Sequence, residues 1–305
     1  MTVLRTAFLH FWPGFEPENF LARFPLPSER VRLVPTADVR GADLVVFSCF
    51  PGGHRNACTP DPAVTHGATG VRLFYTAENI APDLATCDFA MSFRRDADGE
   101  RHLRVPNYVG TQNLFGFGPE ALLRRAGDPA EIRRSKTRFC TYVQGNSVRL
   151  REEFVRRLSR HRRVDCAGPS LNNTGFVADR RRKYELYRES KFAVTFENEA
   201  APGYTSEKLP DALLMRCVPI YWGDPTVELD FQPGCFLNLK DFPTVEALVA
   251  RVAELDRDDA AYEAMLAAPC YPEGRLPAHA DPARLLAFFE RVASAAGRAG
   301  ARRAS

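Results

Sequence analysis

Short apolar runs recur along the first third of the chain and predict β-strands. They are Ala42 to Cys49 (ADLVVFSC), Val71 to Tyr75 (VRLFY) and Phe89 to Phe93 (FAMSF). Each run is rich in apolar β-branched or aromatic residues and is bounded by Gly, Pro or charged residues, which is typical of buried strands. Because the runs alternate with longer intervening segments, the pattern indicates an α/β domain.

A second pattern of the same kind begins at Phe139 with FCTYV. Helix-like sequence follows over Leu150 to Leu158 and over Arg180 to Lys191. Apolar residues then recur at helical spacing from Thr244 onward and over Pro282 to Ala295. The second half of the chain therefore also predicts α/β structure, with a further helix near its C-terminal end.

A polar, arginine-rich stretch from Phe115 to Lys136 separates the two patterns and is the best candidate for an interdomain connection. The last residues, GRAGARRAS, predict a frayed basic tail. We expect one domain at residues 1–130 and a second at 131–275, followed by a C-terminal helix and basic tail at 276–305.

The run from Phe192 to Pro225 predicts a strand, a polar loop, a helix and a second strand, which together form a βαβ crossover. The first strand ends at Glu197-Asn198, and the second, Val218 to Tyr221, ends at Gly223-Asp224-Pro225. The polar group YTSEK, residues 204–208, lies at the expected start of the helix, with Thr205 or Ser206 as its N-cap. Ligands of such sheets bind outside the carboxyl ends of the strands, so this run predicts a binding site.

Composition limits the kinds of partner. The chain has 305 residues, 45% hydrophobic and 26% charged, and a formal net charge of +3. These values are typical of a soluble protein of one large or two ordinary domains, and the charge is too small to indicate nucleic acid or an anionic membrane as a partner. With no transmembrane-length apolar span and no secretory signal, we expect a cytoplasmic protein that associates with membranes at most weakly and peripherally.

The metal-binding residue types show no ligand spacing. The six histidines are dispersed, and the eight cysteines form no CxxC pair. We therefore expect no metal site and buried, reduced thiols.

Two interpretations of Glu207-Lys208 remain open on the local sequence alone. A carboxylate and a lysine at a helix start are a common capping and solvation pattern. The alternative is an anion site, because free N–H groups at a helix start favour anions. The helix dipole contributes only about 0.3–1 kcal/mol. A fixed cation such as Lys208 would therefore be needed to stabilise a departing diphosphate.

Five blocks of the chain resemble motifs of the α1,3/4-fucosyltransferases, glycosyltransferase family 10, and follow in the order of that family's bacterial members. They cover most of residues 8–245. The blocks are HFWPGFEPENF (His10 to Phe20), FYTAENIAPDLATCDFAMSF (Phe74 to Phe93), RFCTYVQGNSVRLREEF (Arg138 to Phe154), RVDCAGPSLNNTG (Arg163 to Gly175) and FENEAAPGYTSEKLPDALLMRCVPIYWGDP (Phe196 to Pro225).

The resemblance implies an α/β protein of GT-B architecture, with two Rossmann-like domains facing across a cleft. It implies an inverting transferase that moves L-fucose from GDP-fucose, held by the C-terminal domain, to an acceptor oligosaccharide or glycoconjugate. An α1,3 linkage to N-acetylglucosamine or glucose is expected. No cofactor is expected, because two protein cations rather than a metal offset the diphosphate.

The resemblance also assigns roles to individual residues. Glu78 is expected to be the general base, and Lys208 and Arg151 to neutralise the diphosphate. Glu207 is expected to contact the ribose. Further expected contacts of the nucleotide are Asn198, Tyr204 and Ser206, with Arg149 as the alternative to Arg151 and Asn173 as an additional candidate.

Three departures from the family pattern affect these expectations. Ala77 replaces the glycine before the base, Ser206 replaces a threonine, and His10 replaces a common aspartate. The loop from Phe50 to Pro62 is a candidate border of the acceptor site, although an ordinary turn explains it equally well. The alternatives to an α1,3-fucosyltransferase are a transferase of another GDP-deoxysugar or unusual acceptor, and a nucleotide-sugar-binding protein without activity.

Overall fold

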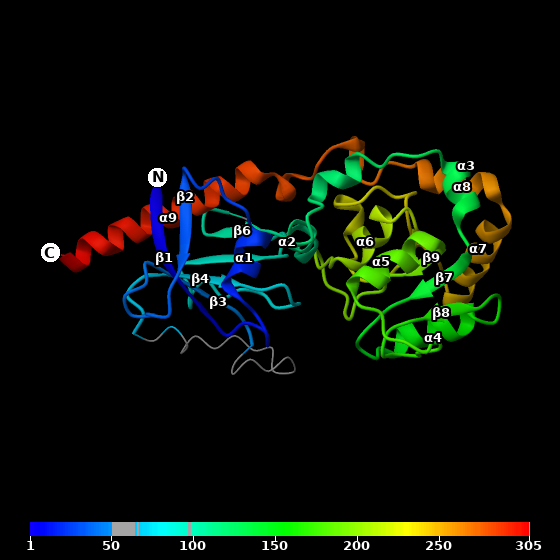
Figure 1. Cartoon of the computed structure of the whole chain (residues 1–305), viewed down its shortest axis with the longest axis horizontal. Coiled ribbons are helices and arrows are strands. Elements are labelled where there is room, and N and C mark those ends of the chain that lie inside the picture. Colours follow the sequence, from blue (N-terminus) through cyan, green and yellow to red (C-terminus); the bar gives the residue numbers. More distant parts are fainter. Residues whose placement is uncertain (51–64, 66, 97–98, 305) are drawn as a thin grey trace. The chain divides into compact units, whose positions relative to one another are not determined.

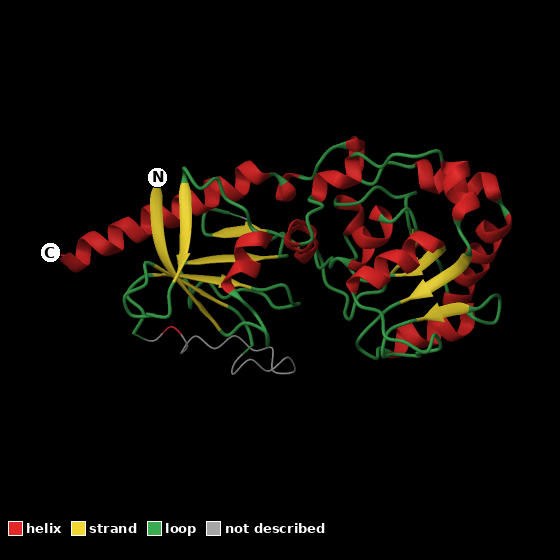
Figure 2. Ribbon diagram, in the orientation of Figure 1, coloured by secondary structure: helices red, strands yellow, loops and turns green. Residues whose placement is uncertain are grey.

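The computed structural model describes residues 1–50, 65, 67–96 and 99–304, so most of the loop from Phe50 to Pro62 and Cys58 lie outside the described residues. The chain divides into two compact units. Unit 1 comprises Met1–Pro119 and Pro277–Ser305, and unit 2 comprises Glu120–Leu276. Both are α/β units built on parallel sheets, as the strand pattern predicted (Figures 1 and 2).

Unit 1 contains a six-stranded parallel sheet in the order β2-β1-β3-β4-β5-β6. Its strands are β1 (Thr2–Leu9), β2 (Val31–Pro35), β3 (Leu44–Phe47), β4 (Val71–Tyr75), β5 (Phe89–Ser92) and β6 (His102–Arg104). Its α-helices are α1 (Pro17–Arg23), α2 (Asn107–Leu114) and α9 (Pro282–Ala304).

Aromatic side chains fill the carboxyl end of this sheet. The Phe11 ring stacks on Phe15 with centroids 3.9 Å apart, and Tyr75 at the end of β4 packs edge-on against Phe20 at 5.5 Å. Helix α9 packs on the same sheet, where Phe289 meets Phe20 and Phe288 meets Phe89. The N-terminal and C-terminal segments thus share one core.

Unit 2 contains a five-stranded parallel sheet in the order β11-β10-β9-β7-β8. Its strands are β7 (Arg138–Tyr142), β8 (Val164–Cys166), β9 (Ser190–Val194), β10 (Val218–Tyr221) and β11 (Leu237–Asn238). Its α-helices are α3 (Pro129–Ser135), α4 (Arg149–Leu158), α5 (Arg180–Glu189), α6 (Lys208–Leu214), α7 (Val245–Arg257) and α8 (Asp259–Ala267).

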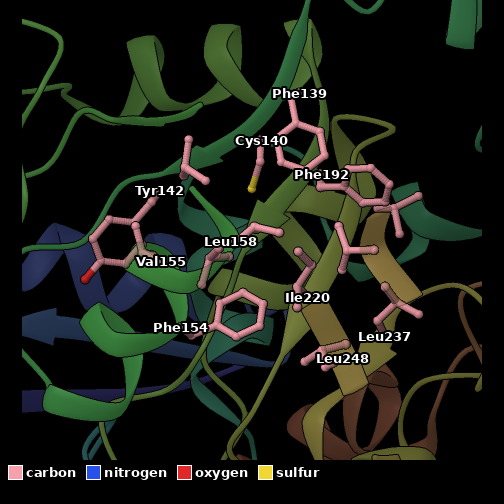
Figure 3. Close-up of a cluster of buried hydrophobic side chains, with 14 of the residues drawn as sticks. Phe139, Cys140, Tyr142, Phe154, Val155, Leu158, Phe192, Ile220, Leu237 and Leu248 are labelled. Atoms are coloured by element: carbon pink, nitrogen blue, oxygen red, sulfur yellow. The ribbon is translucent and has the colours of Figure 1, made fainter. Parts of the chain in front are cut away.

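Successive side chains of β9 point to opposite faces of this sheet, and helices cover both faces. Phe192 and Val194 belong to a buried cluster with side chains of α4, α7 and α8 (Figure 3). Ala193 points to the other face, where it packs with Tyr187 of α5 and Met215. Because both faces of the strand are buried there, the sequence from Phe192 to Val194 is apolar rather than alternating.

Several predicted elements are confirmed and others need correction. Strands β4 and β10 have the predicted bounds, and β9-α6-β10 is the predicted crossover because β9 and β10 pair in parallel. The strand predicted at Ala42 to Cys49 is shorter and spans Leu44–Phe47. The helix predicted to reach Lys191 ends at Glu189, and β9 begins at the next residue, Ser190.

The C-terminal end differs from the expected frayed tail. Helix α9 continues to Ala304. Its last turns are rich in alanine and arginine, which are strong helix formers.

The unit boundary falls inside the stretch expected to connect the domains, because the chain first passes from unit 1 to unit 2 after Pro119. That stretch also contains helix α3. Residues 277–305 then return to unit 1.

Seven cysteines are described, and all are buried free thiols. Among the described helices, none is both long and apolar enough to cross a membrane.

Candidate active site

The polar residues after β9 and β10 converge at the carboxyl end of the unit 2 sheet. Chain direction explains this arrangement, because parallel neighbouring strands end at the same edge. Strand β9 leads directly into Glu197-Asn198, and the chain then returns through α6 to β10, which leads into Gly223-Asp224.

Glu197 is the centre of a buried hydrogen-bond cluster. Its carboxylate accepts bonds from the Ser206 backbone N–H (2.8 Å), the Ser206 hydroxyl (2.7 Å) and the Lys208 ammonium (2.9 Å). Glu197 is fully buried. A Cβ on Gly223 would lie 2.5 Å from Glu197 Cγ, so only glycine fits beside this side chain.

Lys208 is the cation of this cluster. Its Nζ also donates to Ser206 Oγ at 3.0 Å, and its side chain is 12% exposed. Burial acts to lower the pKa of Lys208, but the charges of Glu197 and Glu207 outweigh it and raise the pKa above its usual value. Lys208 is therefore a fixed cation at neutral pH.

Arg151 of α4 lies beside this cluster. Its Nη2 donates to the Phe196 carbonyl (2.8 Å) and to Asn198 Oδ1 (2.9 Å), and its Nη1 donates to the Asn146 carbonyl (3.1 Å). These partners are neutral, although the Arg151 side chain is fully buried. A buried cation with neutral partners leaves positive potential at the site, which acts on Lys208 by lowering its pKa.

Glu207 precedes Lys208 and is partly buried. Burial alone would raise its pKa, but the charges of Lys208, Lys183 and Arg180 outweigh it and lower the pKa to about 2. Glu207 is therefore a carboxylate at neutral pH, able to accept hydrogen bonds from ligand hydroxyls.

Asp224 organises the loop between β9 and α6. Its buried carboxylate accepts bonds from the Gly203 N–H at 2.8 Å and the Thr205 hydroxyl at 3.2 Å. Tyr204, which lies between these two residues, is buried in the loop that Asp224 holds.

Two of the weaker candidates lie differently from the others. Arg149 is the exposed first residue of α4. Asn173 uses both side-chain atoms within its own loop, donating to the Val164 carbonyl and accepting from the Cys166 N–H, each at 2.9 Å. Its amide therefore shapes the chain around β8.

Glu78 lies in unit 1, three residues after the end of β4, and is partly buried. Its backbone N–H donates to the Thr76 hydroxyl at 3.0 Å, which fixes the turn that carries it. Among the described residues other than glycine, positive φ occurs at His10, Leu171, Arg216 and Glu273. Ala77 therefore replaces the family's glycine without backbone strain.

The predicted N-cap of α6 is wrong. The helix begins at Lys208, and its N-cap position is Glu207, with no side-chain cap. The Thr205 hydroxyl donates to Asp224, and the Ser206 hydroxyl donates to Glu197 and accepts from the Lys208 backbone N–H only at a long distance, 3.4 Å. Local sequence favours a hydroxyl cap, but two buried carboxylates require the hydroxyl protons, and these bonds orient Thr205 and Ser206 toward the carboxylates.

Glu197 and Asp224 are the functional candidates that the sequence interpretation missed. Each lies three residues after the end of a buried strand, which was the available signal for both.

The assembled site suits a negatively charged, hydroxylated ligand. Lys208 and Arg151 supply positive charge, and Glu207 supplies a hydrogen-bond acceptor beside them. In the part of the chain that the structure describes, no three His, Cys, Asp or Glu side chains group as metal ligands would.

Comparisons with known proteins identify the class and then the family. Residues 133–267 match the model "Glycosyltransferase family 10 (fucosyltransferase) C-term", and residues 6–110 match "Alpha-(1,3)-fucosyltransferase FucT N-terminal domain". The two parallel sheets have the GT-B fold, and the matched models give the class as a glycosyltransferase. The chain belongs to glycosyltransferase family 10, the fucosyltransferases.

Individual relatives agree with this assignment. The chain is 27% identical over 227 residues to the α-(1,3)-fucosyltransferase FucT of Helicobacter pylori, covering 64% of this chain and 46% of that protein. It is 31% identical over 189 residues to GDP-fucose protein O-fucosyltransferase 3 of Gallus gallus, covering 57% of this chain and 39% of that protein. The chain thus spans less than half the length of these relatives.

Solved structures show the same fold. A crystal structure of an α1,3-fucosyltransferase matches with a TM-score of 0.78 at 23% identity, covering 96% of this chain and 90% of that one. A second crystal structure, described as α1,3-fucosyltransferase with GDP-fucose, matches with a TM-score of 0.75 at 24% identity, covering 96% and 91%.

Proposed function

We propose that the protein transfers L-fucose from GDP-fucose to an acceptor glycan hydroxyl, with inversion at the anomeric carbon. The observation that carries the proposal is the pair of cations after β7 and β9. Lys208 is held by Glu197, and Arg151 is buried with neutral hydrogen-bond partners. Such a pair suits a diphosphate, and a relative of the same fold is described with GDP-fucose.

The donor residues act on the leaving group. As the bond from the fucose anomeric carbon to the diphosphate oxygen breaks, negative charge grows on GDP. Lys208 and Arg151 stabilise that charge, and Glu207 orients the nucleotide through the ribose hydroxyls. Fixed charges aimed at developing charge are commonly among the largest contributions to catalysis.

The acceptor side needs a base. The acceptor oxygen attacks the anomeric carbon from the face opposite GDP, and its proton passes to the Glu78 carboxylate. A positioned general base contributes typically about 10²–10⁴-fold. Because protein cations supply the charge at the diphosphate, we propose that no metal ion or other cofactor is required.

The acceptor that we favour is N-acetylglucosamine or glucose in an oligosaccharide or glycoconjugate, fucosylated through an α1,3 linkage. Similarity to proteins named α-(1,3)-fucosyltransferases supports this choice. A protein hydroxyl is the second candidate, supported by the similarity to a GDP-fucose protein O-fucosyltransferase.

A transfer assay tests the proposal. The protein is incubated with GDP-fucose, with or without EDTA, against N-acetyllactosamine, lactose and serine-containing peptides, and the product linkage is read by NMR. We expect α1,3-fucosylated sugar in both conditions. Fucosylated peptide alone would favour the second candidate, and transfer abolished by EDTA would contradict the metal-independent mechanism.

The variant Glu78→Gln separates chemistry from donor binding. It should lower turnover at least about 100-fold, because the amide cannot take the proton. GDP affinity measured by calorimetry should stay within about twofold of the parent, as it should in the exposed control Glu29→Gln. Full turnover in Glu78→Gln would show that another group is the base.

A further inference from the structure

A buried ion cluster joins α5 to the helix that begins at the donor site. The Asp211 carboxylate of α6 accepts bonds from Lys183 Nζ (2.6 Å), Arg180 Nη1 (3.0 Å) and the Tyr184 hydroxyl (3.2 Å). Asp211 is 1% exposed. None of these side chains belongs to the donor contacts proposed above.

The ion cluster lies one helical turn from Glu207 along α6. The Asp211 N–H donates to the Glu207 carbonyl at 2.9 Å, so Asp211 is one helical turn further along α6. Residues four apart lie on the same face of a helix. The two cations bound to Asp211 therefore also face Glu207, and their charges act on it.

Two carboxylates compete for these cations. Burial raises the pKa of Asp211, and the charge of Glu207 adds to that effect. For Glu207 the charges of Lys208, Lys183 and Arg180 outweigh burial and keep the pKa at about 2. A carboxylate in this position would be difficult to keep ionised with Lys208 alone.

We infer that Lys183 and Arg180 are positioning residues, anchored by Asp211, which hold Glu207 in place as the ionised acceptor for the donor's ribose hydroxyls. The inference rests on the proposed function, because it assigns the ribose to Glu207. Helix α5, none of whose residues is among the proposed donor contacts, would thus contribute to the selectivity for the ribose hydroxyls.

All charged or titratable groups around Glu207 enter the pH argument. Those that act on it electrostatically include Lys208 and Asp211 of α6, and Arg180, Lys183 and Tyr187 of α5. Burial raises the Tyr187 pKa far above neutrality, so this hydroxyl stays neutral throughout the range tested. Changes between pH 5 and pH 8 therefore report on the carboxylates.

The experiment measures the affinities of GDP and 2′,3′-dideoxy-GDP by calorimetry from pH 5 to pH 8. The parent should bind GDP about 10- to 100-fold more tightly than 2′,3′-dideoxy-GDP, because only GDP offers hydroxyls to the Glu207 carboxylate. The measured quantity is the ratio of these two affinities. This ratio should not change with pH, because Glu207 stays ionised. In Lys183→Met the ratio should fall about fivefold or more from pH 8 to pH 5, because loss of a cation raises the Glu207 pKa.

Lys191 provides a matched control. It forms a second buried ion pair in unit 2, with Asp256 at 2.9 Å, and its side chain is 12% exposed compared with 11% for Lys183. Lys191→Met should lose comparable stability yet keep the parent's ratio at every pH. Lys183→Arg should restore the pH-independent ratio.

Asp211→Asn distinguishes electrostatics from packing. It breaks the same cluster but removes a negative charge, so the ratio should remain independent of pH. Arg180→Met, at a position whose side chain is 26% exposed, is a second cation variant less prone to misfolding and should behave as Lys183→Met does.

Three outcomes would overturn the inference. They are a parent that binds both nucleotides equally, cation variants whose ratio stays at the parent's value at every pH, and an Asp211→Asn ratio that falls as in Lys183→Met. The first two leave the proposed function intact if GDP still binds. Failure of the parent to bind GDP would instead contradict the proposed function itself.

Discussion

Glu197 shows how one buried side chain can set the geometry of a candidate site through its hydrogen bonds. Its two oxygens hold the backbone and hydroxyl of Ser206 and the ammonium of Lys208. A buried carboxylate left without donors costs several kcal/mol, so these bonds are strongly enforced. The direction of Lys208 is therefore determined by Glu197, which follows β9.

The space beside Glu197 leads to a prediction. Gly223→Ala would place a methyl group 2.5 Å from Glu197 Cγ and 2.8 Å from the Tyr221 hydroxyl. Overpacking of this kind costs about 1–3 kcal/mol, and displacement of Glu197 also displaces Lys208. We expect urea denaturation to show that loss and calorimetry to show at least about tenfold weaker GDP binding.

Gly99→Ala is the matched control, because its added methyl group would meet no atom within 4 Å. It should change neither quantity appreciably. Parent-like GDP binding in Gly223→Ala would show that Glu197 does not position Lys208.

At the scale of single elements, the start of α6 illustrates a conflict between a helix and a site. The helix has seven residues and no side-chain cap, whereas α7 is capped by Thr244, whose hydroxyl accepts the Ala247 N–H at 3.1 Å. The Ser206 hydroxyl is oriented by its donation to Glu197, and its oxygen accepts the Lys208 backbone N–H only at 3.4 Å.

The two hydroxyls should therefore respond differently to removal. Thr244→Ala should lower the unfolding free energy by about 1 kcal/mol and leave GDP affinity unchanged, because it removes only a cap. Ser206→Ala should lower stability by a similar amount or more and weaken GDP binding about tenfold, because Glu197 and Lys208 lose a shared partner. Denaturation and calorimetry on both variants check this, and unchanged GDP binding in Ser206→Ala would count against it.

Some elements could be predicted from sequence and others could not. Strands β4 and β10 are short and mostly buried, with clear boundaries, and both were predicted with the correct bounds. Strand β1 was not predicted, because it carries Arg5 and exposed residues among its apolar ones, and β8 has only three residues. Pairing with neighbouring strands, rather than local pattern, makes these segments strands.

The site shows the same limit. Lys208, Glu207 and Asn198 could be proposed because they follow the first strand of the crossover in a recognisable motif. The role of Asp211 and Lys183 could not be, since they lie 28 residues apart and meet only when α5 packs beside α6. Long-range charge pairs leave no local signal.

At the scale of the whole molecule, the proposed donor residues are confined to unit 2. Arg151, Asn198, Ser206, Glu207 and Lys208 all lie within Glu120–Leu276. Hydrogen exchange should therefore show GDP-dependent protection at the end of β9 and in α6, with less change in β1 to β6. UDP at the same concentration is the control for guanine recognition and should protect less. Equal protection in both units would contradict this assignment.

The placement of α9 has a consequence for biosynthesis. Unit 1 is made of two segments, and all of unit 2, about 160 residues, is translated between them. At roughly 5–20 residues per second the first segment waits about 8–30 s for Phe288 and Phe289 to reach its sheet. Unit 2 is continuous and can therefore fold before unit 1 is complete, although unit 1 begins the chain.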